Sequence, residues 1–386
     1  MWRDGAIRVA RIGGIVIDIH FSFGLVLFWG AWEGWSRYSN YSGALYGLLA
    51  VALLFACILL HELGHALLAR ALGVNASRIT LLPVGGLAQF ETSPAYAWQE
   101  LIIVLTGPLV NLILALVLGV SIYFLQPSLS LANWPSYLFS LYPPTLTGLA
   151  LYLMGANIAL FLFNMLPAFP MDGGRTLRAS LALVLDYEMA TRLAAGLGCA
   201  LAILMIVLGL AGWPSVGLMP NPFLLIVAVV VAMGAYQEER HVRRQRALVR
   251  TEVGSICRLP SHVIAPWDTV SPPLVQRLFK RERVLPVMVG DRLVGLLTHA
   301  DAQKGARRHQ PVTVAHLMRS DFPILRPHDT LWVALQEMDI SQLYYLPVVN
   351  NGIFLGFVSL DHIEDAWRSV SRRRDTAGLV SGGTSQ

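Results

Sequence analysis

The sequence is poor in charged residues and in cysteine. Only 14% of its 386 residues are Asp, Glu, Lys or Arg, whereas 55% are hydrophobic, and a water-soluble fold does not accommodate that balance. Three cysteines do not make a disulfide framework. The net charge is +5, but no basic patch with interleaved aromatic residues accompanies it, so no nucleic-acid partner is expected. These deficits predict a protein of the lipid bilayer.

Six apolar stretches near the N-terminus are long enough to cross a bilayer. The last is the shortest. The first is followed by Glu33 and Trp35 rather than by a small-residue cleavage site, so we expect it to remain as a span. The six expected spans cover approximately residues 15–35, 45–69, 101–125, 147–166, 193–212 and 222–236.

The arginines indicate which ends of these spans face the cytoplasm, because basic residues favour that side in short loops. They precede the first expected span and follow the second, fourth and sixth. This distribution predicts a cell-membrane protein with both termini in the cytoplasm. The arginine-rich run 240–250 has two interpretations, a stop-transfer anchor, which we favour, and a clamp for lipid headgroups.

One short segment places three ionisable side chains inside the second expected span. It reads His61-Glu62-Leu63-Gly64-His65, and an ionisable side chain in a spanning helix costs about 2.5–3.5 kcal/mol. The two histidines are four residues apart and share a helix face, and Glu62 is close enough to reach a metal-bound water. This spacing favours a hydrolytic zinc site over a buried His/Glu pair that only joins helices.

Catalytic zinc needs a third protein ligand and an open position for water. Asp172 is the best candidate, because it follows the fourth expected span in a segment that Pro167, Pro170 and two glycines interrupt, so the chain can fold back there. The expected topology places Asp172 and His61 at the same depth. His20 is the rival ligand, and its alternative role is that of an interfacial histidine.

At these residues the chain resembles the site-2 proteases, which are intramembrane zinc metalloproteases, in the branch that carries cytoplasmic CBS domains. Residues 61–66 are similar to the first motif of that family and residues 164–175 to its second motif. Residues 106–111 and 82–87 are similar to further family segments. The resemblance covers nearly the whole chain.

The resemblance implies a zinc metalloendopeptidase that hydrolyses peptide bonds in or near the transmembrane segments of single-span membrane proteins, as in regulated intramembrane proteolysis. It implies one Zn²⁺ per chain, bound by His61, His65 and Asp172, with Glu62 as the catalytic base. The chemistry agrees, because zinc lowers the pKa of its water towards about 7 and a neighbouring carboxylate can accept the proton.

A peptide bond inside a transmembrane helix is protected by helical hydrogen bonds, so the substrate has to be unwound and held extended. Residues 77–91, around Gly85 and Gly86, are expected to offer a strand edge for this purpose, and the alternative is a surface hairpin without a substrate role. Polar side chains in or beside spans can line a water route, bind substrate backbone or only join helices. Three asparagines are such candidates: Asn111, Asn157 and Asn164.

From about Thr251 the composition becomes that of a soluble protein, and a repeat appears at an offset of 61 residues. Leu285-Pro286-Val287 recurs as Leu346-Pro347-Val348, which indicates a duplication. The two units resemble a pair of CBS motifs. Such pairs commonly bind adenine nucleotides through a Gly-x-x-Thr/Ser-x-x-Asp turn, and they also form homodimers.

The first CBS motif contains that turn with Thr298 and Asp301, whereas the second CBS motif has Ser359 followed by His362 in the place of aspartate. We therefore expect one site for ATP, ADP or AMP rather than two. A dimerisation module without a ligand is the alternative. In either case we expect a homodimer formed through these CBS motifs.

The predicted fold class is a multi-pass α-helical membrane domain of six spans followed by a soluble α/β CBS pair. The alternatives are a CBS-bearing metal transporter, although the spans show no internal symmetry, and a scaffold without catalysis. The expected domains are a protease domain at 1–237, a basic linker at 238–250, CBS motifs at 251–310 and 311–368, and a disordered tail at 369–386.

Overall fold

The structure is a computed structural model, and it describes residues 5–83, 85–90, 94–125, 144–212, 219–280, 282–307 and 311–369. The chain divides into two compact units, Met1–Arg240 and His241–Gln386, and each is described by itself. Apart from Ser369, the expected tail at 369–386 lies outside the described residues, so its disorder stays a prediction.

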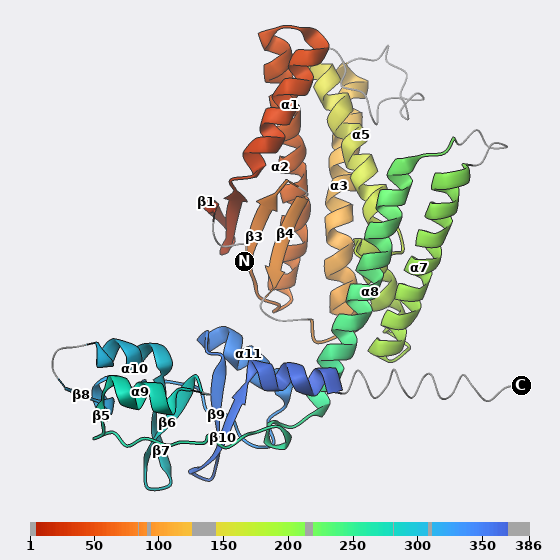
Figure 1. The fold of residues 1–386 in the computed structure, drawn as a ribbon. Coiled ribbons are helices and arrows are strands. Elements are labelled where there is room, and N and C mark those ends of the chain that lie inside the picture. The colour runs from red at the N-terminus through yellow and green to blue at the C-terminus, as the bar shows by residue number, and fades with distance from the viewer. Residues whose placement is uncertain are drawn as a thin grey trace, which may run out of the picture. The chain divides into compact units, whose positions relative to one another are not determined.

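A four-stranded sheet opens the first unit, with strand order β1-β2-β3-β4. Two antiparallel hairpins, β1–β2 and β3–β4, meet where β2 and β3 pair in parallel. Ile15 and Ile79 of the sheet are fully buried in one cluster with Leu63 and Ala66 of helix α2, so the sheet lies against the second half of that helix (Figure 1). The strands are β1 (Ala6–Ile12), β2 (Ile15–His20), β3 (Ala76–Leu82) and β4 (Gly85–Phe90).

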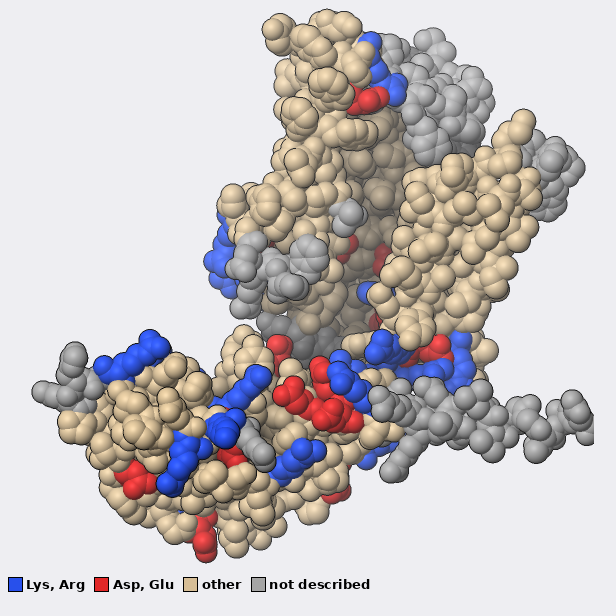
Figure 2. Space-filling view, in the orientation of Figure 1, with Lys and Arg blue, Asp and Glu red and all other residues tan. Residues whose placement is uncertain are grey.

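Five helices in the described residues are long and apolar enough to cross a membrane, and they correspond to the second to sixth expected spans. In the space-filling view their visible surface carries few charged side chains, which gather towards the helix ends (Figure 2). Residues 238–250, expected as a linker, continue the last of these helices. The five are α2 (Tyr41–Ala71), α3 (Ala97–Leu125), α5 (Leu146–Asn164), α7 (Tyr187–Ala211) and α8 (Pro222–Arg250).

The expected first span over 15–35 is wrong in its bounds. Residues 15–20 form β2, and the helix that follows, α1 (Phe23–Tyr38), has 16 residues, fewer than the roughly 20 that a span needs. The chain reverses at Gly13 and Gly14, which both adopt positive φ and so close the β1–β2 hairpin. Six spans are therefore not confirmed, while the fold class of a multi-pass helical domain holds.

Glycines allow α1 and α2 to pack closely. Gly30 and Gly34 of α1 face Gly43 and Gly47 of α2, and a Cβ on Gly34 or Gly47 would collide with a backbone carbonyl of the facing helix. Two small-x-x-x-small stripes in contact are typical of helix pairs in membranes, where backbones approach without large side chains between them. The pair anchors the first half of α2 while the sheet covers the second half.

A short helix, α6 (Asp172–Leu181), follows α5 after a partly buried loop. Ala168 and Phe169 of this loop are almost completely buried, and Met171 is 5% exposed. Ala168 and Met171 pack with Ala202 of α7 and Ala228 of α8. Part of the loop is therefore covered by the helices α7 and α8 that follow it.

The second unit consists of two similar halves. The bridge between Ile264 and Val287 recurs as Leu325 with Val348, and the bridge between Leu296 and Arg319 recurs as Phe357 with Arg258. Every partner differs from its equivalent by 61 residues, which confirms the duplication. The elements are η3 (Val253–Ser255), β5 (Thr269–Val270), α9 (Pro272–Leu278), β6 (Val284–Val289), β7 (Arg292–Thr298), α10 (His299–Ala306), β8 (Val312–Thr313), η4 (Val314–His316), α11 (Leu331–Ser341), β9 (Tyr345–Asn350) and β10 (Ile353–Ser359).

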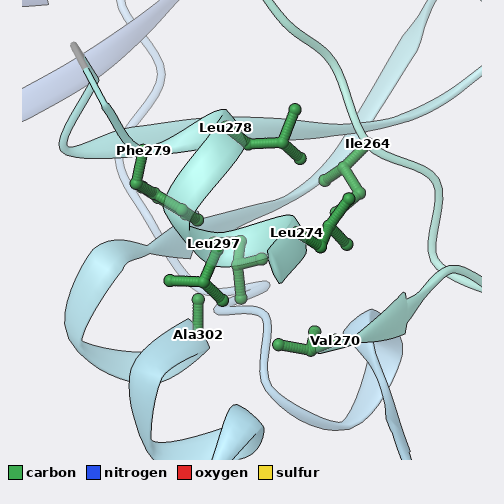
Figure 3. Close-up of a pocket in the computed structure, with 8 residues that line it drawn as sticks. Ile264, Val270, Leu274, Leu278, Phe279, Leu297 and Ala302 are labelled. Atoms are coloured by element: carbon green, nitrogen blue, oxygen red, sulfur yellow. The ribbon is translucent and has the colours of Figure 1, made fainter. Parts of the chain in front are cut away.

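The interior of the first half contains a pocket with an entirely apolar lining (Figure 3). Recognition of a ribose or a phosphate needs hydrogen-bond donors or acceptors, and this lining offers no side chain of that kind. The pocket is part of the apolar core and is not a nucleotide site. Its lining residues are Ile264, Val270, Leu274, Val275, Leu278, Phe279, Leu297 and Ala302.

Candidate metal centre

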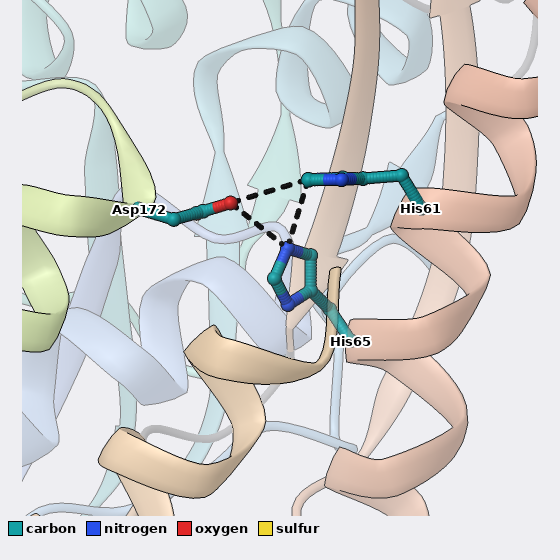
Figure 4. A group of neighbouring side chains, drawn as sticks. All are labelled: His61, His65 and Asp172. Carbon is teal, nitrogen blue, oxygen red and sulfur yellow. Dashed lines mark hydrogen bonds and ion pairs between the residues drawn. The ribbon is translucent and has the colours of Figure 1, made fainter. Parts of the chain in front are cut away.

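His61, His65 and Asp172 converge on one point. The two histidines project from one face of α2, and Asp172 is the first residue of α6, 107 or more positions later in the chain. The Nε2 atoms of the histidines are 3.1 Å apart, and each lies 3.2 Å from Oδ2 of Asp172 (Figure 4). All three side chains are at least 85% buried.

This triangle fits a zinc ion. Ligand atoms about 2.0–2.1 Å from a tetrahedral zinc lie about 3.3–3.4 Å from one another, close to the observed separations. The donor set of two imidazoles and one carboxylate is also one that zinc uses in catalytic sites. Among the described residues these three form the group of His, Cys, Asp and Glu side chains that could hold a metal ion.

Neighbouring groups orient the three donor atoms. Nδ1 of His65 donates a hydrogen bond to the carbonyl oxygen of Ile103 at 2.8 Å, which leaves Nε2 with its lone pair directed at the centre. Asp172 lies outside the five candidate spans. Burial opposes the ionisation of Asp172, but the neighbouring His61 and His65 outweigh it and lower the pKa of this carboxyl below its ordinary value. A carboxylate is the form in which this side chain binds a metal.

Two glycines bring neighbouring elements against the site. A Cβ on Gly107 of α3 would collide with Nε2 of His65 and lie 2.7 Å from Nε2 of His61, and a Cβ on Gly86 of β4 would lie 2.5 Å from Cγ of Glu62. Gly107 was not singled out from the sequence. Its only signal was its place in the family-like segment 106–111.

Three further glycines close the loop that carries Asp172. A Cβ on Gly173 would lie 2.6 Å from the backbone of Met165, and one on Gly174 would lie 2.5 Å from the backbone of Ala168. Gly234 of α8 faces the other side, where a Cβ would lie 2.7 Å from the nitrogen of Pro170. The absence of side chains at these positions fixes where α6 begins.

The expected substrate residues lie on the hairpin β3–β4 and on helices α3 and α5. The strand edge expected over 77–91 is the hairpin β3–β4, in which Gly85 has a positive φ of 139° and β4 is the edge strand. Asn111 and Asn157 are both fully buried. Neither polar atom of the Asn111 amide has a hydrogen-bond partner among the described residues, and neither does Oδ1 of Asn157. Asn164 is half-buried at the last position of α5.

His20 is not part of the centre. Its Nδ1 lies 2.6 Å from the hydroxyl of Ser22 beside the start of α1, and it does not belong to the candidate metal group.

The expected nucleotide turns differ between the two halves of the second unit. Thr298 donates to Oδ2 of Asp301 at 2.7 Å, and that oxygen lies 3.4 Å from Nε of Arg319. In the second half, the hydroxyl of Ser359 accepts a hydrogen bond from the backbone N–H of His362 at 3.2 Å. Burial and the nearby charge of Arg258 lower the pKa of His362, so this ring does not replace the negative charge of Asp301.

Comparison with known proteins gives two family matches and several relatives. Residues 49–208 match the profile of peptidase family M50, and residues 314–368 match that of the CBS domain. A zinc metalloprotease of Methanocaldococcus jannaschii is 34% identical over 292 residues, which is 76% of this chain and 78% of that protein. Rip3 of Mycobacterium tuberculosis, also assigned as a zinc metalloprotease, is 28% identical over 86% of this chain and 85% of its own. A solved site-2 protease from Methanocaldococcus jannaschii is 34% identical, covers 61% of this chain and 95% of its own, and superposes with a TM-score of 0.40.

Proposed function

Since this chain belongs to peptidase family M50 as a zinc metalloprotease of the site-2 type, we propose that it hydrolyses peptide bonds in or near the transmembrane segments of single-span membrane proteins. It is a multi-pass membrane protein with a CBS domain in its second unit. Membership in the family removes the support for a metal transporter.

The convergence of His61, His65 and Asp172 beside Glu62 is the observation that carries this proposal. The three residues bind one zinc ion, and Glu62, one residue after the first histidine, is the catalytic base. The ion supplies a Lewis acid and a water of lowered pKa. Glu62 accepts the proton of the attacking water at its carboxylate and transfers it to the leaving amine nitrogen.

The edge of β4 is the proposed binding site for the substrate. An unwound substrate segment that adds to this strand has its backbone held extended, and Gly86 places that edge directly against Glu62. Gly85 gives β4 its turn geometry at the entry.

Asn111, Asn157 and Asn164 are proposed to serve water or substrate backbone close to the centre. An unpaired buried amide costs about 1–3 kcal/mol, and the first two asparagines carry such atoms. Water or a substrate backbone would satisfy them, because a backbone N–H can donate to the Oδ1 atoms and a backbone carbonyl can accept from Nδ2 of Asn111. Hydrogen bonding between helices is the competing role, and a partner across the helices is absent for Asn111 in the described residues.

The location of the termini and the role of the second unit are also proposals. We place both termini in the cytoplasm, on the basis of the arginine distribution. The second unit is proposed to bind an adenine nucleotide at Thr298 and Asp301, with Ser359 as the weaker counterpart, and to form the homodimer. Nucleotide or assembly state then adjusts the protease activity.

The test of the proposed function compares wild type with Glu62→Gln, and uses Glu33→Gln as control because Glu33 pairs with Arg37 on the exposed part of α1. We expect about one zinc per chain in all three proteins. Cleavage of a model transmembrane substrate should fall at least about 100-fold in Glu62→Gln, the lower range for loss of a general base, and stay unchanged in Glu33→Gln. Zinc binding without cleavage in wild type would refute the proteolytic role.

A further inference from the structure

A buried charge cluster lies six residues after Asp172 in the same helix. Arg178 of α6 donates from Nε to Oε1 of Glu100 at 3.1 Å, and its Nη2 also bonds Glu100. Its Nη1 bonds Glu238. The side chains of Arg178 and Glu100 are 6% and 10% exposed, and that of Glu238 is 25% exposed. One guanidinium therefore joins α3, α6 and α8.

The same guanidinium contacts two aromatic rings. Its Cζ lies 5.4 Å from the ring centroid of Phe169 and 5.1 Å from that of Tyr187 at the start of α7, distances at which a cation is attracted to a ring face. Phe169 comes three residues before Asp172, and Arg178 comes six residues after it. The cluster thus holds the segment that carries Asp172 from both sides.

The geometry of this cluster is specific to arginine. Its planar fork serves two carboxylates and two ring faces at once, whereas a lysine ammonium presents a single point of charge. Each partner of such a buried set needs the others, because an uncompensated buried charge is unfavourable. The cluster consequently has one well-defined arrangement rather than a range of them.

Close packing transmits this arrangement to the metal centre. Gly173 and Gly174 touch the backbone of the preceding loop, and Gly234 of α8 touches Pro170. No side chain is available at these positions to absorb a shift of α6. A displacement of Arg178 is therefore expected to move the carboxylate of Asp172 relative to the two histidines on α2.

We propose that Arg178 is a positioning residue that, held by Glu100 and Glu238, sets the third metal ligand opposite His61 and His65. This rests on the proposed function, because it takes Asp172 as a zinc ligand. Glu238 gives α8 a direct part in the arrangement. That helix runs on to Arg250, and its Leu248 is buried in the apolar core of the second unit.

The test uses two conservative variants and one matched control in the full-length protein. Arg178→Lys keeps the charge and removes the fork, and Glu238→Gln keeps the volume and removes the charge on α8. Glu239→Gln is the control, since Glu239 is the next residue on α8 but lies 4.0 Å from Arg192, whose side chain is 53% exposed. The measurements are the rate of zinc release to a chelator, the unfolding temperature in detergent, and kcat and KM with zinc in excess.

We expect Arg178→Lys and Glu238→Gln to release zinc at least tenfold faster than wild type and Glu239→Gln. With zinc in excess, both variants should have a KM within twofold of the wild-type value and should recover most of the wild-type kcat. A double variant should release zinc no faster than the product of the single effects would give, because both changes act on one arrangement.

Equal zinc release in all variants would overturn the proposal, as would faster release that follows only the loss of unfolding temperature, which is the result of a purely structural role. Glu238 is partly exposed, and a glutamine in its place can still accept a hydrogen bond from Arg178. Glu238→Gln therefore tests the proposal if Arg178→Lys fails to fold. Wild type that retains zinc without cleaving substrate would refute the proteolytic role alone. Wild type that binds no zinc would overturn both.

Discussion

Gly107 lies on α3 directly against the two histidines of α2, where a Cβ would meet Nε2 of His65. The ring of His65 cannot retreat, because its Nδ1 bonds the carbonyl oxygen of Ile103 on the same α3 helix. The space for a metal ligand is thus defined by a residue without a functional group. At this scale the site depends as much on missing atoms as on the donor atoms.

Gly107→Ala should therefore reduce zinc binding. The added methyl group displaces the His65 ring from its position opposite Asp172, so we expect less than a tenth of the zinc content of wild type after dialysis, measured by elemental analysis. Gly196→Ala is the control, because Gly196 of α7 has open space around its Cβ position and alanine favours a helix by about 1 kcal/mol. Equal zinc contents in the two variants would contradict this role of Gly107.

The donor residues could be predicted from the sequence, whereas Gly107 could not. His61 and His65 share a helix face through their spacing alone, and Asp172 follows from the prolines and glycines beside it. The structure brings these three side chains together as expected. The contact of Gly107 with His65 depends on how α3 is rotated against α2. The rotation and distance between two helices cannot be read from the sequence. Arg178 was missed for the same reason, since its partners Glu100 and Glu238 lie 78 and 60 positions away.

At the scale of elements, the prediction from sequence was wrong for strand β2 of the sheet. Residues 15–35 are continuous enough in apolar character to predict a span, but 15–20 form a strand. Periodicity does not separate a short buried strand from a helix segment. The β-branched residues Ile15, Val16, Ile17 and Ile19 and the preceding pair of glycines were the signals for a strand. The hairpin β3–β4 was predictable, because its turn lies between two runs with alternating character.

The closeness of β4 to α2 gives a prediction for the hairpin. In Gly86→Ala the methyl group, 2.5 Å from Cγ of Glu62, should push the strand away from the base without touching the three donor atoms. We expect zinc content to remain at the wild-type level while kcat falls at least tenfold, measured with the same transmembrane substrate. A parallel loss of zinc and activity would show instead that the hairpin supports the metal centre as a whole.

At the scale of the whole molecule, a duplication and a membrane domain are both evident from sequence alone. The offset of 61 residues predicts two similar halves, and the paired bridges of the second unit confirm them. Apolar length identifies five of the helices. Where equivalent positions of the two halves carry different residues, the contacts of one position cannot be inferred from those of the other.

The difference between Asp301 and His362 is the basis for the proposed number of nucleotide sites in the second unit. Asp301 presents a carboxylate held by Thr298 and Arg319, and a carboxylate can accept hydrogen bonds from both ribose hydroxyls. His362 occupies the equivalent place, and its lowered pKa leaves the ring neutral at pH 7. We therefore expect isothermal titration of the purified protein with ATP or AMP to give one site per chain.

Two substitutions test that count in opposite directions. Asp301→Ala should abolish nucleotide binding, and His362→Asp should raise the stoichiometry from one to two, because it completes the Gly-x-x-Ser-x-x-Asp turn that begins at Gly356. Asp361→Ala is the control, since Asp361 occupies a variable position of the turn, next to His362, and is exposed. Binding that survives Asp301→Ala would place the nucleotide elsewhere. No binding in any variant would leave the second unit as a dimerisation module, and a change of oligomeric state with protein concentration would then be its expected property.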